Sequence, residues 1–334
     1  MKSLILPPLS ALYSAVTRTR LALYERGTFH TTKLDRPVIS VGNMTVGGTG
    51  KTPLVEWVAK ALASNGKKVC ILTRGYGRQN AERQVIVSDG QAILATPAEA
   101  GDEPYLLATN LLGQAAVICN ADRISAGRDA IEVFGTECFV LDDGFQHLRL
   151  ARDLDIVTID ATNPWGGGQL LPYGRLREPL SGLKRAYCVV LTRCNQVKDL
   201  APLRNQILDL IGGRYLFEST MQPRRPPHPD GPVAAFCAIG NPQSFFTQLK
   251  AEGYTLAVET VFRDHHTYTQ KDIDELIRTA TRAGAKTLIT TAKDAVKLHN
   301  FTFLLPYKVF EIEIAFKDEE VLRSILRNVF EPHL

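Results

Sequence analysis

A glycine-rich stretch from Val38 to Pro53 reads VISVGNMTVGGTGKTP and ends in a lysine followed by a threonine. Backbone N–H groups of such a loop can close around phosphate oxygens, and the amino end of the next helix adds partial positive charge. Lys51 would reach the β- and γ-phosphates of a nucleotide, and Thr52 would bind Mg²⁺ through its hydroxyl. This segment therefore predicts a site for a nucleotide and Mg²⁺.

One position departs from the usual phosphate-binding pattern, because Thr45 stands where that pattern has glycine. A threonine can follow the loop if its φ angle is negative. An ordinary glycine-rich turn is the alternative, but an apolar strand before the loop and a helix after it favour the nucleotide site. The residues expected to contact the nucleotide are Thr45, Val46, Gly47, Gly48, Thr49, Gly50, Lys51 and Thr52.

Two adjacent carboxylates follow a second apolar run in the segment CFVLDDGFQH. A carboxylate at the carboxyl end of a strand beside the phosphate loop is how this kind of fold holds Mg²⁺. Asp-Asp-Gly is also a good turn sequence, so the segment alone is a weak signal. Together with the loop, it predicts Asp142 and Asp143 as metal ligands.

Further candidates are weaker when they are taken one at a time. Asp102 and Glu103 begin a helical run, where spacing alone favours capping of the helix dipole. The segment FRDHHTY places Asp264 beside two histidines, which can form a dyad or a metal site but are more often a polar loop. Arginines stand between prolines in LLPYGRLREP, and RGYG follows an apolar run, where ligands often gather.

Strands alternate with helices along most of the chain. The strand PVISVG precedes the glycine-rich loop, and TPLVEWVAKALASNG after it has helical spacing of apolar residues. Further apolar runs occur at KVCILT, AAVICN, CFVLDD, LDIVTID and YCVVLT. We expect an α/β fold with a mostly parallel sheet that is covered on both faces.

The segment 221–232, MQPRRPPHPDGP, contains five prolines and a glycine and is predicted to be a linker. This divides the chain into a phosphate-loop domain over residues 1–220 and a smaller α/β domain over 233–334. The formal charge of +4 is too weak to argue for nucleic acid as a partner. No run of eighteen apolar residues is present, and Pro7-Pro8 argues against a signal peptide.

Residues 9–26 have the spacing of an amphipathic helix with a basic edge, with Leu9, Leu12, Tyr13, Val16, Leu23 and Tyr24 near one face. Spacing alone favours packing of this helix on its own domain over a position on a membrane surface.

The ordered set of motifs resembles one family, the tetraacyldisaccharide 4'-kinases of the lipid A pathway. The matching segments are LPPLSALYSAVTRTR, SVGNMTVGGTGKTP, RGYGR, GDEP, DDGFQH, LLPYGRLREP, FRDHH and TAKDAVKL. The resemblance implies a RecA-like P-loop domain, a smaller α/β domain and an active site in the cleft between them. It also implies transfer of the γ-phosphoryl group of ATP to the 4'-hydroxyl of a tetraacylated glucosamine disaccharide 1-phosphate, which gives lipid IVA.

The same resemblance assigns roles to residues. Lys51 and Thr52 serve ATP and Mg²⁺, Asp142 and Asp143 serve the metal and the acceptor end, Asp102 becomes the base, and His265 completes a dyad with it. Residues expected at the disaccharide or nucleotide site are Asn43, Arg74, Tyr76, Glu103, Arg123, Gln146, Arg177 and Glu178. Ala292 in TAKD departs from the glutamate common in the family, so a polar role at that position is in doubt.

Because the implied acceptor is a lipid, a position of the N-terminal helix on a membrane surface becomes favoured over packing on its own domain. We therefore expect a monomeric peripheral protein on the cytoplasmic face of the bacterial inner membrane. Two rivals are a P-loop ATPase that acts as a nucleotide-gated membrane switch and a lipid carrier. A GTPase is disfavoured, since no Asn-Lys-x-Asp or Thr-Lys-x-Asp segment for guanine is present.

Overall fold

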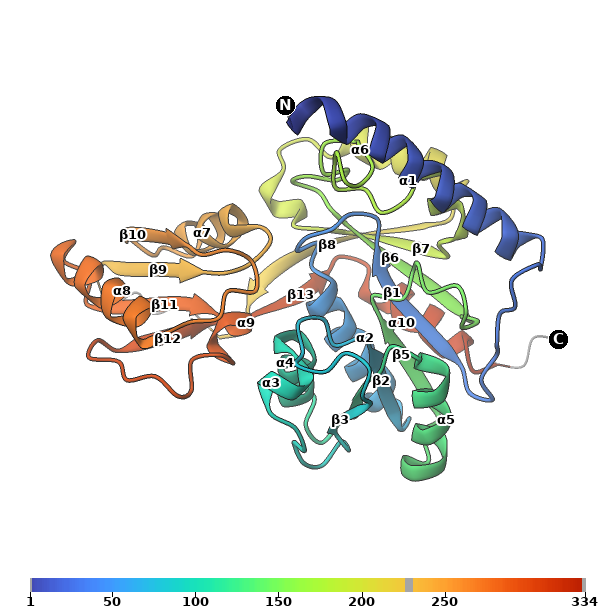
Figure 1. Cartoon of the computed structure of the whole chain (residues 1–334), viewed down its shortest axis with the longest axis horizontal. Helices are drawn as coiled ribbons and strands as arrows, with labels where there is room; N and C mark the ends of the chain where they lie inside the picture. Colours follow the sequence, from blue (N-terminus) through green and yellow to red (C-terminus); the bar gives the residue numbers. More distant parts are fainter. Residues whose placement is uncertain (1, 226–230, 332–334) are drawn as a thin grey trace.

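A computed structural model describes residues 2–225 and 231–331 of the chain. Its larger lobe is built on a nine-stranded sheet with the order β13-β8-β7-β6-β1-β5-β2-β4-β3 (Figure 1). The strands are β1 (Val38–Asn43), β2 (Val69–Thr73), β3 (Val85–Ser88), β4 (Ala115–Cys119), β5 (Cys138–Asp142), β6 (Leu154–Asp160), β7 (Cys188–Thr192), β8 (Tyr215–Pro223) and β13 (Ile312–Phe316). Strand pairs are parallel except β3 with β4 and β13 with β8. The expected mostly parallel sheet is therefore confirmed.

Alternation along the central strands sends successive side chains to opposite faces of the sheet. Ile39 and Val41 of β1 pack in the core with helix α2 (Lys51–Ser64), whereas Val38 packs in the core with α5 (Arg123–Phe134). Both faces are therefore covered, which explains why these strands are continuous apolar runs. The other helices of this lobe are α3 (Pro97–Ala100), α4 (Asp102–Asn110), α6 (Ala201–Ile211) and α10 (Glu319–Asn328), with short 3-10 turns at Leu180–Arg185 and Cys194–Gln196.

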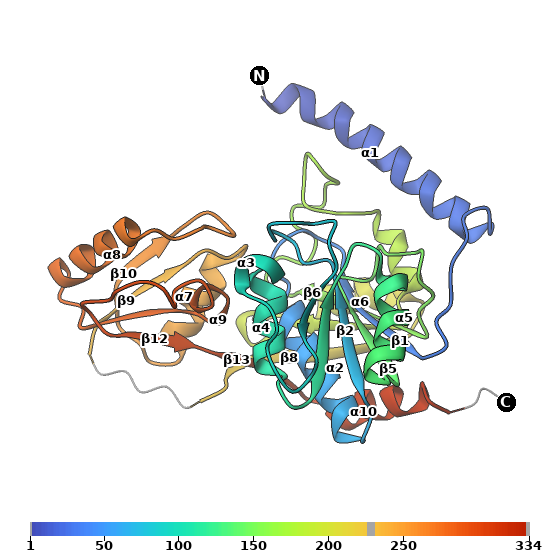
Figure 2. The same cartoon turned by 60° about the horizontal axis from the view of Figure 1, so that its bottom comes forward.

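The smaller lobe has a parallel four-stranded sheet with the order β10-β9-β11-β12. Its strands are β9 (Val233–Cys237), β10 (Leu256–Val261), β11 (Thr287–Thr291) and β12 (Tyr307–Phe310), and its helices are α7 (Pro242–Ala251), α8 (Gln270–Arg282) and α9 (Ala292–Ala295). Figures 1 and 2 show this lobe beside the larger one, with β8 and β13 running between the two.

The expected domain boundaries need correction at two places. YKVFEIEI is two strands in different sheets: β12 stays in the small lobe, and β13 pairs with β8 in the large sheet. The chain then continues into α10, whose Leu322 and Leu326 are buried with residues of α2. Residues from Ile312 onward thus belong to the large lobe. The predicted linker at 221–232 begins within β8, and its residues 226–230 lie outside the described part of the chain.

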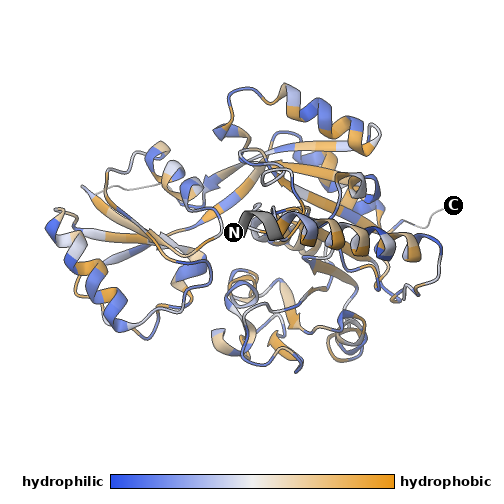
Figure 3. Ribbon diagram, turned by 45° about the horizontal axis from the view of Figure 1, so that its top comes forward, coloured by the Kyte–Doolittle hydropathy of each residue, from blue (hydrophilic) through white to orange (hydrophobic). Residues whose placement is uncertain are grey.

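Helix α1 (Lys2–Glu25) begins before the expected residue 9 and includes Pro7 and Pro8. It runs across the outside of the large lobe (Figure 2) and is rich in apolar residues (Figure 3). Side chains of α1 donate hydrogen bonds to backbone carbonyls of the large lobe: Ser10 Oγ to Leu170 O (2.8 Å), Tyr13 Oη to Arg177 O (2.8 Å) and Arg20 to Gln146 O (3.1 Å).

The apolar residues expected on one face of this helix differ in burial. Tyr13, Leu23 and Tyr24 are half-buried, whereas Leu9, Leu12 and Val16 are exposed, at 45%, 62% and 59%. Within residues 2–225 and 231–331, no helix is both long and apolar enough to span a bilayer.

Candidate active site

The glycine-rich loop connects β1 to α2, as the motif requires. Gly47 and Gly50 have left-handed φ angles of 119° and 82°, which glycine adopts without a steric cost. Thr45 is not among the described non-glycine residues with positive φ. It pairs with Leu176 in an antiparallel bridge, beside the hydrogen bond from Val46 N–H to Arg175 O (2.8 Å). A threonine is therefore tolerated because this part of the loop is paired to the segment that carries Arg177.

A layer of polar side chains supports the loop from below. Asn43 has no exposed surface, and its Nδ2 donates to Thr45 O (2.6 Å) and Thr49 Oγ1 (3.0 Å). Thr192 Oγ1 donates to Thr49 O (2.9 Å), and Arg193 donates to Gly48 O (3.0 Å). All these bonds come from residues of the large lobe, so this lobe alone can hold the loop in its conformation.

Lys51, Arg177 and Asp143 form a charged group at the mouth of the loop. Lys51 Nζ lies 2.7 Å from Asp143 Oδ1, and Arg177 Nη1 donates to both Asp143 oxygens at 2.7 Å. Burial alone would raise the pKa of Asp143, but these two cations hold it well below its usual range. Asp143 is thus ionised, and both cations are oriented toward the loop.

Asp142, one residue earlier at the end of β5, is in a different environment. Burial raises its pKa to about 6, although Lys51 opposes this shift, and Thr73 Oγ1 donates to it at 2.9 Å. Strand β5 is paired directly with β1, so Asp142 lies beside the strand that leads into the loop.

These residues fit the oxygen chemistry that Mg²⁺ requires. Thr52, in the first turn of α2, and the carboxylates of Asp142 and Asp143 are hard oxygen donors next to the phosphate loop. In the described part of the chain, no group of three or more His, Cys, Asp or Glu side chains could hold a metal by itself. A magnesium ion here would therefore take part of its ligands from nucleotide phosphates and water, as in P-loop enzymes.

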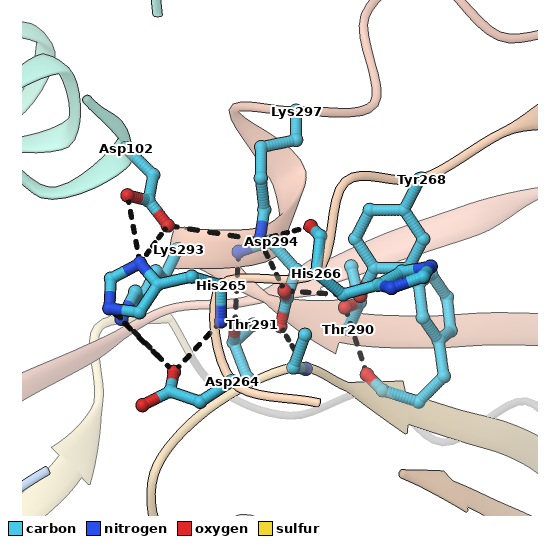
Figure 4. Close-up of polar contacts among 12 residues, drawn as sticks. Asp102, Asp264, His265, His266, Tyr268, Thr290, Thr291, Lys293, Asp294 and Lys297 are labelled. Carbon is cyan, nitrogen blue, oxygen red and sulfur yellow. Dashed lines mark hydrogen bonds and ion pairs between the residues drawn. The ribbon is translucent and has the colours of Figure 1, made fainter. Parts of the chain in front are cut away.

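Asp102 and His265 meet across the two lobes (Figure 4). His265 follows β10 in the small lobe and has a left-handed φ of 60°, and its Nδ1 lies 3.2 and 3.1 Å from the two oxygens of Asp102. Asp102 is the first residue of α4 and follows the N-cap residue Gly101, so its carboxylate lies in the first turn, where it complements the helix dipole. The same carboxylate also contacts His265, so the two interpretations of Asp102 are compatible.

Two lysines that were not among the expected site residues lie around this pair. Lys293 Nζ lies 2.9 Å from Glu103 Oε1, 3.3 Å from His265 Nε2 and 3.5 Å from Asp264 Oδ1. Lys297 Nζ lies 3.8 Å from Asp102 Oδ2. Burial alone would raise the pKa of Asp102, but the hydrogen bond from His265 and the charges of both lysines lower it below the usual value.

A buried carboxylate, Asp294 in the single turn α9, holds one of these lysines, Lys297. Asp294 is completely buried and accepts hydrogen bonds from Ala238 N–H (3.0 Å), Thr291 Oγ1 (2.7 Å) and Tyr268 Oη (3.1 Å). Lys297 Nζ lies 3.2 Å from it. Two lysines four residues apart after a strand were the signal for this group in TAKDAVKL.

A cavity of about 620 Å³ between the lobes joins the two groups. Its lining residues include the loop from Val46 to Thr52 and, at the other end, Glu103, His265 and Lys293. Asp143 and Arg177 line it between these ends. Asp102 is not a lining residue; it contacts His265 and keeps 8% of its surface exposed.

The arrangement is that of a phosphoryl-transfer site, with phosphate binding at one end and an ionised carboxylate at the other. A family model for tetraacyldisaccharide-1-P 4'-kinase matches residues 2–331. The chain belongs to this kinase family.

Comparison with individual proteins leads to the same family. The tetraacyldisaccharide 4'-kinase of Geobacter metallireducens is 45% identical over 299 residues, covering 88% of each chain. That of Geobacter sulfurreducens is 42% identical over 332 residues, covering 96% of this chain and 91% of the relative. The crystal structure of LpxK from Aquifex aeolicus in complex with ATP is 32% identical, with a TM-score of 0.77 and coverage of 97% of this chain and 98% of that one. The expected P-loop fold with a second α/β domain is confirmed.

Two residues expected at the substrate or nucleotide site are buried in this structure. Asn43 lies beneath the loop, as described above. Glu178 has no exposed surface and pairs with Arg185 (2.8 Å), while it accepts a hydrogen bond from Gln146 Nε2 (2.8 Å). Both side chains are buried in this structure, and their expected contacts at the substrate or nucleotide site stay predictions. Gln146 also lies within hydrogen-bond reach of Arg177 (3.4 Å).

The remaining expected residues are at the borders of the site. Tyr76 is 72% exposed, and its ring centroid lies 5.4 Å from that of His265. Arg123 is 6% exposed, donates to Ala121 O (3.2 Å) and does not line the cavity. Burial lowers its pKa, although the charges of Asp142 and Asp143 oppose this, so it lies in the field of those carboxylates. Arg74 is exposed and does not line the cavity.

Proposed function

We propose that this chain transfers the γ-phosphoryl group of ATP to the 4'-hydroxyl of a tetraacylated disaccharide 1-phosphate, with Asp102 as the base. The observation that carries the proposal is that one cavity is lined by the phosphate loop at one end and by His265, the partner of Asp102, at the other. Membership of the tetraacyldisaccharide 4'-kinase family supports the choice of donor and acceptor.

At the donor end, the chain's work is to hold and neutralise the phosphates. The backbone N–H groups from Gly47 to Thr52 would surround the β-phosphate, and Lys51 and Arg177 would stabilise charge on the transferred group. Asp143 keeps both cations aimed at this place before the nucleotide arrives. Bound Mg²⁺, held by Thr52 with Asp142 and Asp143, would add positive charge against the phosphates.

At the acceptor end, the chain's work is to orient the hydroxyl and take its proton. Asp102 has a lowered pKa, so it is ionised at neutral pH and able to accept a proton. His265 orients this carboxylate from the small lobe, and Glu103 and Tyr76 would flank the arriving sugar. Asp102 keeps 8% of its surface exposed, so its carboxylate is not fully closed off from the acceptor hydroxyl. Because the pair spans two lobes, we expect catalysis to depend on their closure.

The direct test combines the purified chain with ATP, Mg²⁺ and the disaccharide 1-phosphate in detergent. We expect a product phosphorylated at the 4'-position, identified by mass spectrometry and phosphorus NMR. A matched acceptor in which hydrogen replaces the 4'-hydroxyl should give no phosphorylated product. If the folded chain hydrolysed ATP at the same rate with or without acceptor and formed no product, the nucleotide-gated switch would be favoured instead.

The N-terminal helix supports a second part of the proposal, namely that the chain acts while resting on a membrane surface. Leu9, Leu12 and Val16 form an exposed apolar strip on α1, and Arg18, also exposed, lies about half a turn around the helix from Val16. A helix that carries both an exposed apolar strip and basic side chains is typical of the interface of anionic bilayers. The acyl chains of the proposed acceptor would be in that same bilayer.

The strip can be tested with Leu12→Glu/Val16→Glu. Burial of two such side chains contributes roughly 2–4 kcal/mol in total, so the bound fraction on phosphatidylethanolamine–phosphatidylglycerol vesicles should fall at least about tenfold in flotation. Thr28→Glu/His30→Glu adds the same charge at exposed positions beyond the helix and should float nearly as wild type does. Equal flotation of both variants, with unchanged circular dichroism, would exclude the strip as the membrane contact.

A further inference from the structure

Lys293 occupies a position that the phosphate-loop mechanism does not explain. It comes from α9 of the small lobe, and its side chain is only 16% exposed. Its ammonium group lies between Glu103 (2.9 Å) of the large lobe and Asp264 (3.5 Å) of its own lobe. The third neighbour is the free ring nitrogen of His265, with 3.3 Å between Nζ and Nε2. Figure 4 shows the histidine ring between Asp102 and this lysine.

The two contacts of the imidazole ring have opposite requirements for the proton. An ammonium group has three donors and no acceptor, so Nε2 facing Lys293 must act as an acceptor. An ionised carboxylate only accepts, so Nδ1 facing Asp102 must carry a hydrogen. Only one protonation state satisfies both neighbours: the neutral ring with its proton on Nδ1.

We propose that Lys293 is a positioning residue that holds His265 in this neutral tautomer, and thereby makes Asp102, not His265, the group that accepts the proton of the acceptor hydroxyl. The inference rests on the proposed role of the Asp102–His265 pair. In the step, the hydroxyl proton passes to an Asp102 oxygen while the hydroxyl oxygen bonds to the γ-phosphorus, and the bond from that phosphorus to the ADP oxygen breaks. Nε2 cannot take this proton because Lys293 already donates to it.

The surrounding charges agree with this assignment. The groups that face His265 are Asp102 and Glu103 from α4, Asp264 beside it, Lys293 and Lys297 from the segment after β11, and the ring of Tyr76. The hydrogen bond with Asp102 raises the pKa of His265, and burial and Lys293 act against that rise. Carboxylates around Lys293 raise its own pKa although burial opposes them, so the lysine keeps its charge. Lys293 thus extends the pH range in which the ring is neutral.

The competing arrangement is an imidazolium ring bonded to carboxylates on both sides. It would need Nε2–H to reach Asp264, but Asp264 Oδ1 is 3.9 Å from Nε2, beyond hydrogen-bond distance. It would also direct that hydrogen at the ammonium group of Lys293. The observed geometry opposes both requirements.

The tautomer is read directly by NMR on the free full-length protein labelled with ¹³C and ¹⁵N histidine. His265 signals are assigned by their loss in His265→Gln. Above its pKa, wild type should show nitrogen couplings of the Nδ1–H form. In Lys293→Met, loss of the nearby cation should raise the midpoint of His265 protonation by roughly 1 pH unit. An Nε2–H tautomer in wild type, or an unmoved midpoint in the variant, overturns the proposal.

Kinetics distinguish this role from phosphate binding. Lys293→Met should shift the acidic limb of the kcat profile to higher pH by a similar amount, with KM for ATP changed less than about threefold. Lys293→Arg keeps the cation and should restore the wild-type limb. Lys286→Met removes an exposed lysine of the same lobe and serves as the control. A KM for ATP raised more than about tenfold with an unmoved limb makes the lysine a nucleotide ligand and overturns the proposal.

The positioning role of Lys293 and the base role of Asp102 are tested by separate measurements. The tautomer is measured without substrate, whereas the base role of Asp102 is measured from product formed by the Asp102→Asn variant. A wild-type Nδ1–H tautomer together with an active Asp102→Asn variant would remove the base assignment and the positioning role that depends on it. An Nε2–H tautomer together with an inactive Asp102→Asn variant would remove the role of Lys293 alone.

Discussion

The two ends of the cavity are built on different principles. The donor end is centred on one continuous segment, from Asn43 to Thr52, whose backbone would bind phosphate. Side chains of the same lobe support this segment, among them Thr192, Arg193 and Asp143. The acceptor end is assembled from α4, the loop after β10 and α9, which are far apart in the chain and belong to two lobes. There, charged side chains make the contacts.

This difference determines how each end depends on the arrangement of the lobes. The loop is held by side chains of its own lobe. The small lobe makes hydrogen bonds to residues beside the loop, from Arg175 to Gly240 O (3.4 Å) and from Asn241 to Asp160 (3.1 Å). The acceptor end has its carboxylate on one lobe and its histidine and lysines on the other. Motion between the lobes would therefore change the acceptor end first, and the phosphate site should remain competent for binding.

The strongest way to test the comparison is to remove the cation at the donor end. Lys51→Met should lower kcat by at least about 10³-fold, because the lysine supplies charge stabilisation in a site that excludes water. The loss should be the same in saturating acceptor, since the donor end is formed within one lobe. Initial rates with varied ATP and acceptor measure this.

The matched control is Lys68→Met, which removes an exposed lysine beyond the end of α2. It should leave kcat within about twofold of wild type, as expected for surface substitutions. A Lys51→Met variant with more than a tenth of wild-type kcat would show that the charge of Lys51 is not the main contribution to kcat at the donor end. The proposed difference between the two ends would then be wrong for the donor end.

A smaller loss is expected at the acceptor end. Asp102→Asn cannot accept a proton and should lower kcat by about 10²–10³-fold, the usual range for a general base. The Kd for ATP should stay within a few-fold, because the donor end does not depend on this carboxylate. Glu132→Gln, an exposed change on α5, is the control. Titration calorimetry gives the Kd, and an ATP affinity lowered in proportion to kcat would show that the two ends are not independent.

The sequence was informative where function is carried by neighbours in the chain. The strand, glycines, lysine and threonine of the loop, and the Asp142-Asp143 pair, predicted the donor end and the P-loop fold, because local pattern sets backbone conformation. It was less informative where function depends on tertiary contacts. Spacing alone favoured a cap for Asp102, and only the family resemblance paired it with His265.

Burial and tertiary partners were hard to predict for the same reason. Asn43 and Glu178 are in motifs near the site, but a motif does not tell whether a side chain is exposed to the cavity or buried, and both are buried here. Lys293 was passed over because its role depends on three groups distant in sequence. The return of the chain to the large sheet at Ile312 was missed for a related reason: the pairing partner of β13 is β8, and sequence alone does not name partners between strands.

The smallest expected effect separates two adjacent carboxylates within the donor end. Burial raises the folded-state pKa of Asp142 to about 6, so folding takes up a proton between the unfolded pKa and that value. Its contribution is fully present below the unfolded pKa and is lost as pH rises through about 6. Asp142→Asn should therefore stabilise the metal-free protein by about 1–3 kcal/mol at pH 8, and by about 1 kcal/mol less at pH 5.

Asp143 has the opposite sign, since its pKa is lowered by Lys51 and Arg177. Its ionised form contributes stability above the unfolded pKa that is lost as pH falls, so Asp143→Asn should destabilise at pH 8. Urea unfolding of both variants in EDTA at pH 5 and pH 8 measures the two effects. If both substitutions changed the free energy of unfolding in the same direction, the two carboxylates would share one environment. Opposite signs would indicate that Asp142 costs stability to keep a buried carboxylate at the metal position, while Asp143 is stabilised by the cations it aims at the phosphates.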